Sequence, residues 1–247
     1  MSDDSVYSKG LVYDDENPTA SENDEWKGIR INRLHEQATN RKSGFPQALA
    51  EEGSYFTVTN PTPGTGLIGI AASTAYDAAE TFLMIRNVSA TKKLTLHYLH
   101  LKVTAAGTNG TTFGVTMVGD RGTSRYTSGG AALTPVNPNM GSSTTSGATV
   151  YAGPLVTTAA SSSARILGDY PLRTVIKVIG DSYLFTFGAE TPSTFSGIPL
   201  EGTTQASLQI PCPPVTLGEN DQFLFHEYGA SQSVGAAYTM SLGFWLR

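Results

Sequence analysis

The segment GTGLIG at residues 64–69 matches G-x-G-x-x-G, a pattern that in nucleotide-binding proteins closes a strand-to-helix turn around a pyrophosphate. Its surroundings argue against that chemistry. Pro61 and Pro63 separate it from the strand expected at 55–59, and the segment that follows is too short for the crossover helix of a parallel sheet. We therefore expect no dinucleotide and no other cofactor.

The histidines and the cysteine do not form a ligand set in the sequence. His97 and His100 point to opposite faces of a regular strand, so they could share a metal ion only across a β-bulge, and no nearby acid completes the site. The single cysteine, Cys212, lies between two prolines, which is typical of a strand end or edge rather than of a nucleophile. No metal site is expected.

Catalytic patterns for hydrolysis are equally unsupported. The chain contains no G-x-S-x-G motif, and its 23 serines would produce chance matches to a Ser-His-Asp arrangement. The acids Asp77, Asp120, Asp169 and Asp181 stand singly and several of them at expected turns, so no pair of catalytic carboxylates is indicated. These patterns predict a protein that is not an enzyme.

Charge is concentrated in the first fifth of the 247 residues. Residues 1–52 hold 11 of the 21 acids and 6 of the 16 bases, so residues 53–247 hold ten of each and are neutral. A neutral body offers no basic face for nucleic acid, and no apolar stretch is long enough to span a membrane. The start of the chain also lacks a signal-peptide pattern, which predicts synthesis in a cytoplasm.

Residues 1–52 show no sustained period of a helix or strand, and we interpret them as an extended or partly helical arm. A disordered terminus is the alternative. One short helix is expected at 46–52, with Gly53 as its left-handed cap. Apolar residues scattered among bases suggest an arm that orders on a partner. The residues expected to bind that partner are Trp26, Ile29, Arg30, Ile31, Arg33, Leu34, Arg41 and Lys42.

From residue 54 onward the hydrophobic period changes to two and turn signals recur, which is typical of strands. Ser and Thr make up 22% of the chain and charged residues only 15%, a composition that also disfavours helices. The expected strands are 55–59, 82–88, 94–103, 113–117, 164–168, 172–179, 182–187, 205–210, 222–228 and 236–246.

Finer features of these strands can also be predicted. The apolar run 82–88 indicates a strand that is covered on both faces, and a β-bulge near Tyr98 would reconcile the two parities within 94–103. Residues 107–110, which end in Asn109-Gly110, carry the strongest hairpin signal of the chain, and Gly180-Asp181 favours a two-residue hairpin between neighbouring strands. In the last strand the alternate residues point inward, namely Tyr238, Met240, Leu242, Phe244 and Leu246.

Residues 121–148 have little periodicity and are expected to form one long loop. Many short strands without alternating helices favour an all-β fold, an antiparallel β-sandwich, with the jelly roll as the expected topology. The domain organisation predicted from the sequence is an arm at 1–52 followed by a sandwich body at 53–247.

The low-charge β body, the charged arm and the phrases NPTPGTGLIGIAAS, RYTSGGAALTPVNPNM and ASQSVGAAYTMSLGFWLR resemble virion proteins of tailed bacteriophages, nearest to the capsid decoration, or cement, class. This resemblance implies a jelly-roll or related domain, commonly a homotrimer, on the capsid surface of the virion. It also implies a function: bridging neighbouring subunits of the major capsid protein, without catalysis.

Two other functions stay open at this point. A phage fibre or a receptor- or glycan-binding protein would also be rich in β-strands, and Tyr126 or Tyr151 in loops would offer platforms for sugars. A carbohydrate-active enzyme would require two carboxylates in one cleft. Independently of the resemblance, the scarcity of surface charge predicts that the body associates with itself, as a trimer.

Overall fold

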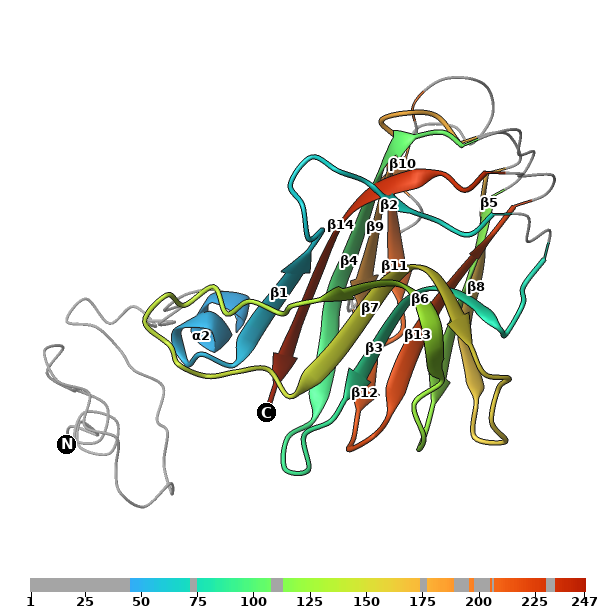
Figure 1. Ribbon diagram of the computed structural model, residues 1–247. Helices are drawn as coiled ribbons and strands as arrows, with labels where there is room; N and C mark the ends of the chain where they lie inside the picture. The colour runs from blue at the N-terminus through green and yellow to red at the C-terminus, as the bar shows by residue number, and fades with distance from the viewer. Residues whose placement is uncertain are drawn as a thin grey trace, which may run out of the picture. The chain divides into compact units, whose positions relative to one another are not determined.

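The computed structural model describes residues 45–71, 75–107, 113–173, 177–188, 196–197, 205, 207–229 and 234–247. Contacts divide the chain into two compact units, Met1–Ala48 and Leu49–Arg247. The second unit contains the strands (Figure 1).

The described residues contain one short helix and a series of strands. They are α2 (Phe45–Glu51), β1 (Tyr55–Thr59), β2 (Leu67–Ile68), β3 (Glu80–Asn87), β4 (Leu94–Ala105), β5 (Phe113–Asp120), β6 (Tyr126–Leu133), β7 (Ala148–Thr157), β8 (Arg165–Arg173), β9 (Ser182–Phe187), β10 (Ser196–Gly197), β11 (Ser207–Cys212), β12 (Thr216–Leu217), β13 (Gln222–Tyr228) and β14 (Ala237–Leu246).

The strands form two sheets that enclose one main hydrophobic core. The first sheet has the order β1-β14-β4-β9-β11-β10, with β2 paired to β14 and β12 paired to β4. The second sheet has the order β6-β7-β3-β13-β5-β8. Among the strands that the structure describes, all pairs are antiparallel except that of β9 and β11, which is parallel. The expected all-β sandwich is confirmed.

The strand order is that of a jelly roll. Eight strands make up this topology, in chain order β1, β3, β4, β5, β8, β9, β13 and β14. The first, eighth, third and sixth of them lie side by side in one sheet as β1-β14-β4-β9. The second, seventh, fourth and fifth lie side by side in the other sheet as β3-β13-β5-β8. This is the arrangement of two interlocked Greek keys. Further strands are additions at the edges, with β6 and β7 beside β3, and with β11 and the two-residue β10 beside β9.

The core between the sheets is rich in aromatic residues from both layers. Phe56 of β1 stacks on Phe244 of β14 with ring centroids 5.7 Å apart, and Phe82 meets Phe225 and Tyr238 edge to face. Such pairs add to the free energy that burial of their apolar area supplies. The sandwich is therefore held by side chains that strand alternation points inward from each sheet.

Several details expected from the sequence are confirmed. The strand β3 is buried along nearly its whole length, and the five alternate residues predicted to face inward from β14 are all buried. The bulge in β4 is also present. Tyr98 pairs with Gly243 and Leu96 with Phe244, so His97 is the extra residue and the inward parity changes there.

Helix α2 ends as its sequence predicts. The amides of Gly53 and Ser54 donate to the carbonyls of Ala50 and Leu49, both at 2.9 Å, and Gly53 has a φ of 72°. A left-handed residue after the last turn is the common way to close a helix, and glycine adopts it without steric cost. The side chain of Leu49 is fully buried.

Both hairpins expected from turn dipeptides are wrong. The residues Asn109-Gly110 lie outside the described residues, but the strands on either side, β4 and β5, belong to different sheets. The strands flanking Gly180-Asp181 also lie in different sheets, and β8 ends at Arg173. In a jelly roll these connections cross from one sheet to the other, which a local turn signal does not reveal.

The loop expected at 121–148 is also partly wrong, because it contains β6. This edge strand pairs with β7 through two register shifts, and Gly129 and Gly130 have φ values of 82° and 60°. Most of its residues are exposed, so its sequence has no alternation that would indicate a strand. Val136 farther along forms an isolated bridge with Thr57 of β1.

Candidate functional site

A concave feature of the described residues lies on the outer face of the first sheet. It is an open groove of about 730 Å³. Its walls come from four strands that are distant in sequence: β4, β9, β11 and β14. The lining residues are His97, Tyr98, His100, Ser182, Leu184, Thr186, Ser207, Leu208, Gln209 and Ser241.

The bulge in β4 creates the histidine-rich side of this groove. Without it, His97 and His100 would point to opposite faces of the sheet, as expected for a regular strand. The extra residue instead leaves His97, Tyr98 and His100 all half-buried on the outer face, while Leu96 and Leu99 face the core.

Hydrogen bonds between neighbouring strands hold these side chains. The hydroxyl of Tyr98 shares a hydrogen bond of 3.0 Å with that of Ser241, and Nε2 of His100 is hydrogen-bonded to Ser182 at 2.8 Å. Nδ1 of His97 lies 2.8 Å from the hydroxyl of Tyr55. The imidazoles of His97 and His100 and the hydroxyl of Tyr98 thus have partners before any ligand arrives, whereas the buried hydroxyl of Thr186 has none among the described residues.

Gly243 allows the two tyrosines to cross β14. A Cβ atom at this position would lie 2.3 Å from the hydroxyl of Tyr55 and 2.4 Å from Cε1 of Tyr98, both closer than atoms can approach. The glycine therefore determines how closely the aromatic rings lie on the sheet.

The groove is uncharged near neutral pH. Burial lowers the pKa of His97, and burial together with the nearby Lys102 lowers the pKa of His100, so both imidazoles are neutral. Burial also raises the pKa of Tyr55, which keeps its hydroxyl protonated. No Asp, Glu, Lys or Arg is among the lining residues, so the groove is suited to uncharged polar or aromatic groups rather than to ions.

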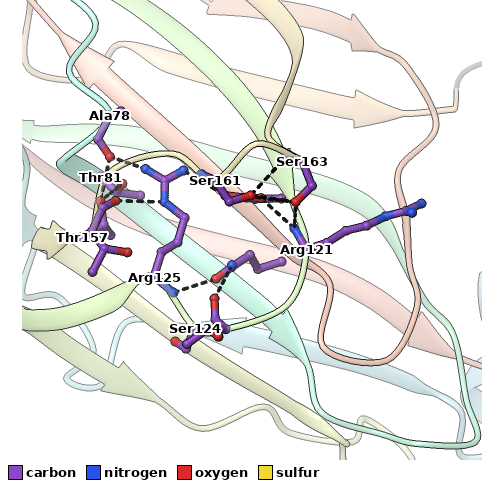
Figure 2. A network of polar contacts seen from close by, with 12 residues as sticks. Ala78, Thr81, Arg121, Ser124, Arg125, Thr157, Ser161 and Ser163 are labelled. Carbon is purple, nitrogen blue, oxygen red and sulfur yellow. Dashed lines mark hydrogen bonds and ion pairs between the residues drawn. The ribbon is translucent and has the colours of Figure 1, made fainter.

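A second concentration of polar side chains lies at the end of β5 in the second sheet (Figure 2). The guanidinium of Arg125 donates from Nε to the carbonyl of Thr158 at 3.0 Å and from Nη2 to the carbonyl of Ala78. Its Nη1 lies 3.6 Å from Oδ2 of Asp120. Arg125 thus joins three segments of the second sheet's rim.

Asp120 receives hydrogen bonds from a loop of serines. The hydroxyls of Ser161 and Ser163 donate to Oδ1, the latter at 2.8 Å, and so does the amide of Arg121 at 2.8 Å. Burial alone would raise the pKa of Asp120, but these hydrogen bonds hold it below its ordinary value. The carboxylate is therefore ionised and serves as the negative partner of Arg125.

The histidine nearest this network does not complete a catalytic triad. Nδ1 of His226 is hydrogen-bonded to the carbonyl of Glu80 at 2.6 Å and lies 3.3 Å from the hydroxyl of Thr81. Burial lowers the pKa of His226 to about 4. With these partners the histidine joins β13 to β3, which indicates a structural role.

The structure also places the other residues singled out in the sequence. Strand β2 lies within the 64–69 glycine motif and pairs with β14, and a Cβ at Gly69 would lie 1.9 Å from Oε1 of Glu227. The glycines at 66 and 69 therefore permit close packing of segments. Cys212 is buried in the core, and burial raises the pKa of its thiol to about 12.

Tyr126 and Tyr151, expected in loops as platforms for sugars, lie on β6 and β7. Their rings stack on each other with centroids 3.9 Å apart. They help to cover a small apolar cluster. The expectation that these tyrosines lie in loops is therefore wrong.

All eight residues expected to bind a partner, from Trp26 to Lys42, lie outside the described residues. Within the described part of the chain, no group of three or more metal-ligating side chains occurs, and no helix has the length and apolar character of a membrane span.

The groove itself was not anticipated as a site. The serines of the groove, like Thr186 and Gln209, belong to no sequence motif. To predict that they lie together, one would have to know which strands pair, in which register, and which side chains of each strand point outward.

Comparisons of the chain with protein-family models, curated proteins and solved structures found no match.

Proposed function

We propose that this protein is a non-enzymatic virion structural protein, which decorates and stabilises a bacteriophage capsid by bridging neighbouring subunits of the major capsid protein. The observation that carries the proposal is the division of the chain into a neutral jelly-roll body and an N-terminal segment that holds the whole net charge. Jelly rolls are common in viral capsid domains, although the fold alone does not determine function.

The division of charge supports separate tasks for the two parts. A rigid sandwich supplies a stable block, and residues 1–52 supply apolar anchors and bases that can follow the surface of a neighbouring subunit. Several arms joined in one homotrimer would bind a capsid far more tightly than a single arm, because the later contacts are intramolecular. The protein would then reside on the capsid surface after synthesis in the host cytoplasm.

The test is attachment of the purified full chain to capsids. Shells assembled from the major capsid protein of the same genome are mixed with the chain, sedimented and imaged by cryo-electron microscopy. We expect co-sedimentation and additional density at regular positions on the shell. Absence of the chain from sedimented shells, with the chain itself folded by circular dichroism, would exclude the decoration function.

A further inference from the structure

The outer face of the first sheet is unusual for a surface in contact with water. Its outward side chains on β1, β14, β4, β9 and β11 include only one charged residue, Lys102, among those described. A soluble monomer ordinarily has charges at a quarter to a third of its surface positions. The outer face of the second sheet, by comparison, carries Arg86 and Asp169.

We propose that this outer face, centred on the groove beside His97, Tyr98 and His100, is the interface between copies of this chain. The inference deepens the proposed function, since it assigns the surface through which the proposed homotrimer forms.

The composition of the face fits a subunit interface. Buried centres of interfaces are depleted in Lys, Glu and Asp and enriched in aromatic residues, and here Tyr98 and Trp245 accompany two uncharged histidines. A rigid sheet also presents these side chains in one conformation, so little conformational entropy is lost when a second surface covers them.

The hydrogen bonds within the face lower the cost of covering it. Burial of a polar group is unfavourable mainly when the group loses its partner in water and gains none. In this face the hydroxyl of Tyr98 is already paired with Ser241, and Nε2 of His100 with Ser182. Removing water from these groups therefore leaves their hydrogen bonds intact.

Charge favours a second copy over an unrelated partner. Residues 53–247 hold ten acids and ten bases, so two bodies do not repel each other through net charge. The groove offers no ionic group by which to select a charged partner, whereas another copy presents the same uncharged polar and aromatic surface. In the proposed trimer one part of this face contacts a different part of the same face on the neighbouring copy, and repetition of that contact by rotation closes a ring of three.

The experiment measures the mass of the full chain by size-exclusion chromatography with light scattering at micromolar concentration. Gln209→Arg adds a charge at an exposed position in the groove, and Ser241→Arg adds one near its centre. The matched control is Ile166→Arg, at a position 65% exposed on β8 of the second sheet. Because Gln209 is exposed, its variant stays informative even where Ser241→Arg fails to fold.

We expect the unmodified chain and Ile166→Arg to have the mass of an oligomer, and Gln209→Arg to shift to the mass of one chain with an unchanged melting temperature. The oligomer should also persist in about 1 M salt, because screening weakens only ionic contacts.

Three outcomes would overturn the proposal. They are a monomeric unmodified chain, an oligomer that survives both groove substitutions, and an oligomer that Ile166→Arg also dissociates. A monomer that binds neutral oligosaccharides on an array, with binding lost in Gln209→Arg, would assign the groove to a glycan instead. Capsid attachment measured on the same variants separates the two proposals, since a monomer that still decorates shells would leave the decoration function standing.

Discussion

Arg125 and Asp120 form a buried ion pair, with Nη1 and Oδ2 3.6 Å apart and side chains only 3% and 0% exposed. The pair links the end of β5 to the start of β6, and the serines at 161 and 163 attach a third segment to the same carboxylate. Removing one partner from such a pair leaves the other charge buried without compensation. Because the ion pair is buried, substitution of either Arg125 or Asp120 should lower the free energy of unfolding substantially.

Asp120→Asn should lower the free energy of unfolding by about 3 kcal/mol, because the guanidinium of Arg125 stays buried without a negative partner. Urea denaturation measures this change. The control is Arg121→Ala, which removes the solvent-exposed ion pair with Asp221, where the arginine side chain is 70% exposed. That pair should contribute less than about 1 kcal/mol. Equal effects of the two substitutions would contradict the structural role of the buried pair.

The buried His226 should make the protein less stable in mild acid. Its pKa is lowered from 6.5 to about 4, mainly by burial, so between these values the unfolded chain binds a proton that the folded chain does not. Stability is complete above pH 6.5 and falls as the pH drops toward 4, by about 3 kcal/mol for this group.

Denaturation curves recorded between pH 7 and 4 measure this slope. His226→Gln, which can still donate to the carbonyl of Glu80, should flatten it. A smaller slope of the same sign should remain, since the pKa values of His97 and His100 are also lowered by burial. A variant as pH-sensitive as the unmodified chain would show that His226 is not the responsible group.

Phe244→Ala should be among the most destabilising core substitutions, at roughly 3 to 5 kcal/mol, because it removes a fully buried ring that stacks on Phe56. Thermal and urea denaturation measure the loss. Val88→Ala, at a position 43% exposed just after β3, is the control and should change stability by less than about 0.5 kcal/mol. Wild-type stability in the Phe244 variant would mean that the ring is not part of the core.

Deletion of residues 1–44 should leave a folded body that no longer attaches to capsids. The deletion ends before α2 because Leu49 is fully buried and belongs to the unit that contains the strands. Circular dichroism reports folding, and co-sedimentation with shells reports attachment.

Trp26→Ala in the full chain provides a milder variant of the same prediction. It should weaken attachment, because burial of a large apolar side chain contributes about 1.5 to 3 kcal/mol. Attachment of the truncated body at full affinity would place the capsid-binding surface on the sandwich instead.

Local pattern in the sequence was sufficient to predict many of the strands and the direction of their side chains. Alternation along residues 237–246 indicates which side of β14 is buried, and the apolar run of β3 indicates burial on both faces. The change of parity in β4 even locates the bulge at His97 and Tyr98. These features are predictable because a pleated strand points successive side chains to opposite faces, whatever its neighbours are.

Pairing between strands and the groove were decided only by the tertiary structure. Gly180-Asp181 has the sequence of a hairpin turn, yet its flanking strands join different sheets, because covering both layers of the core outweighs a local turn preference. The groove gathers His100, Ser182, Gln209 and Ser241 from four strands, whose proximity depends on registers set across the whole sandwich. Residues that meet only through such long-range pairing leave no spacing in the sequence from which their site could be predicted.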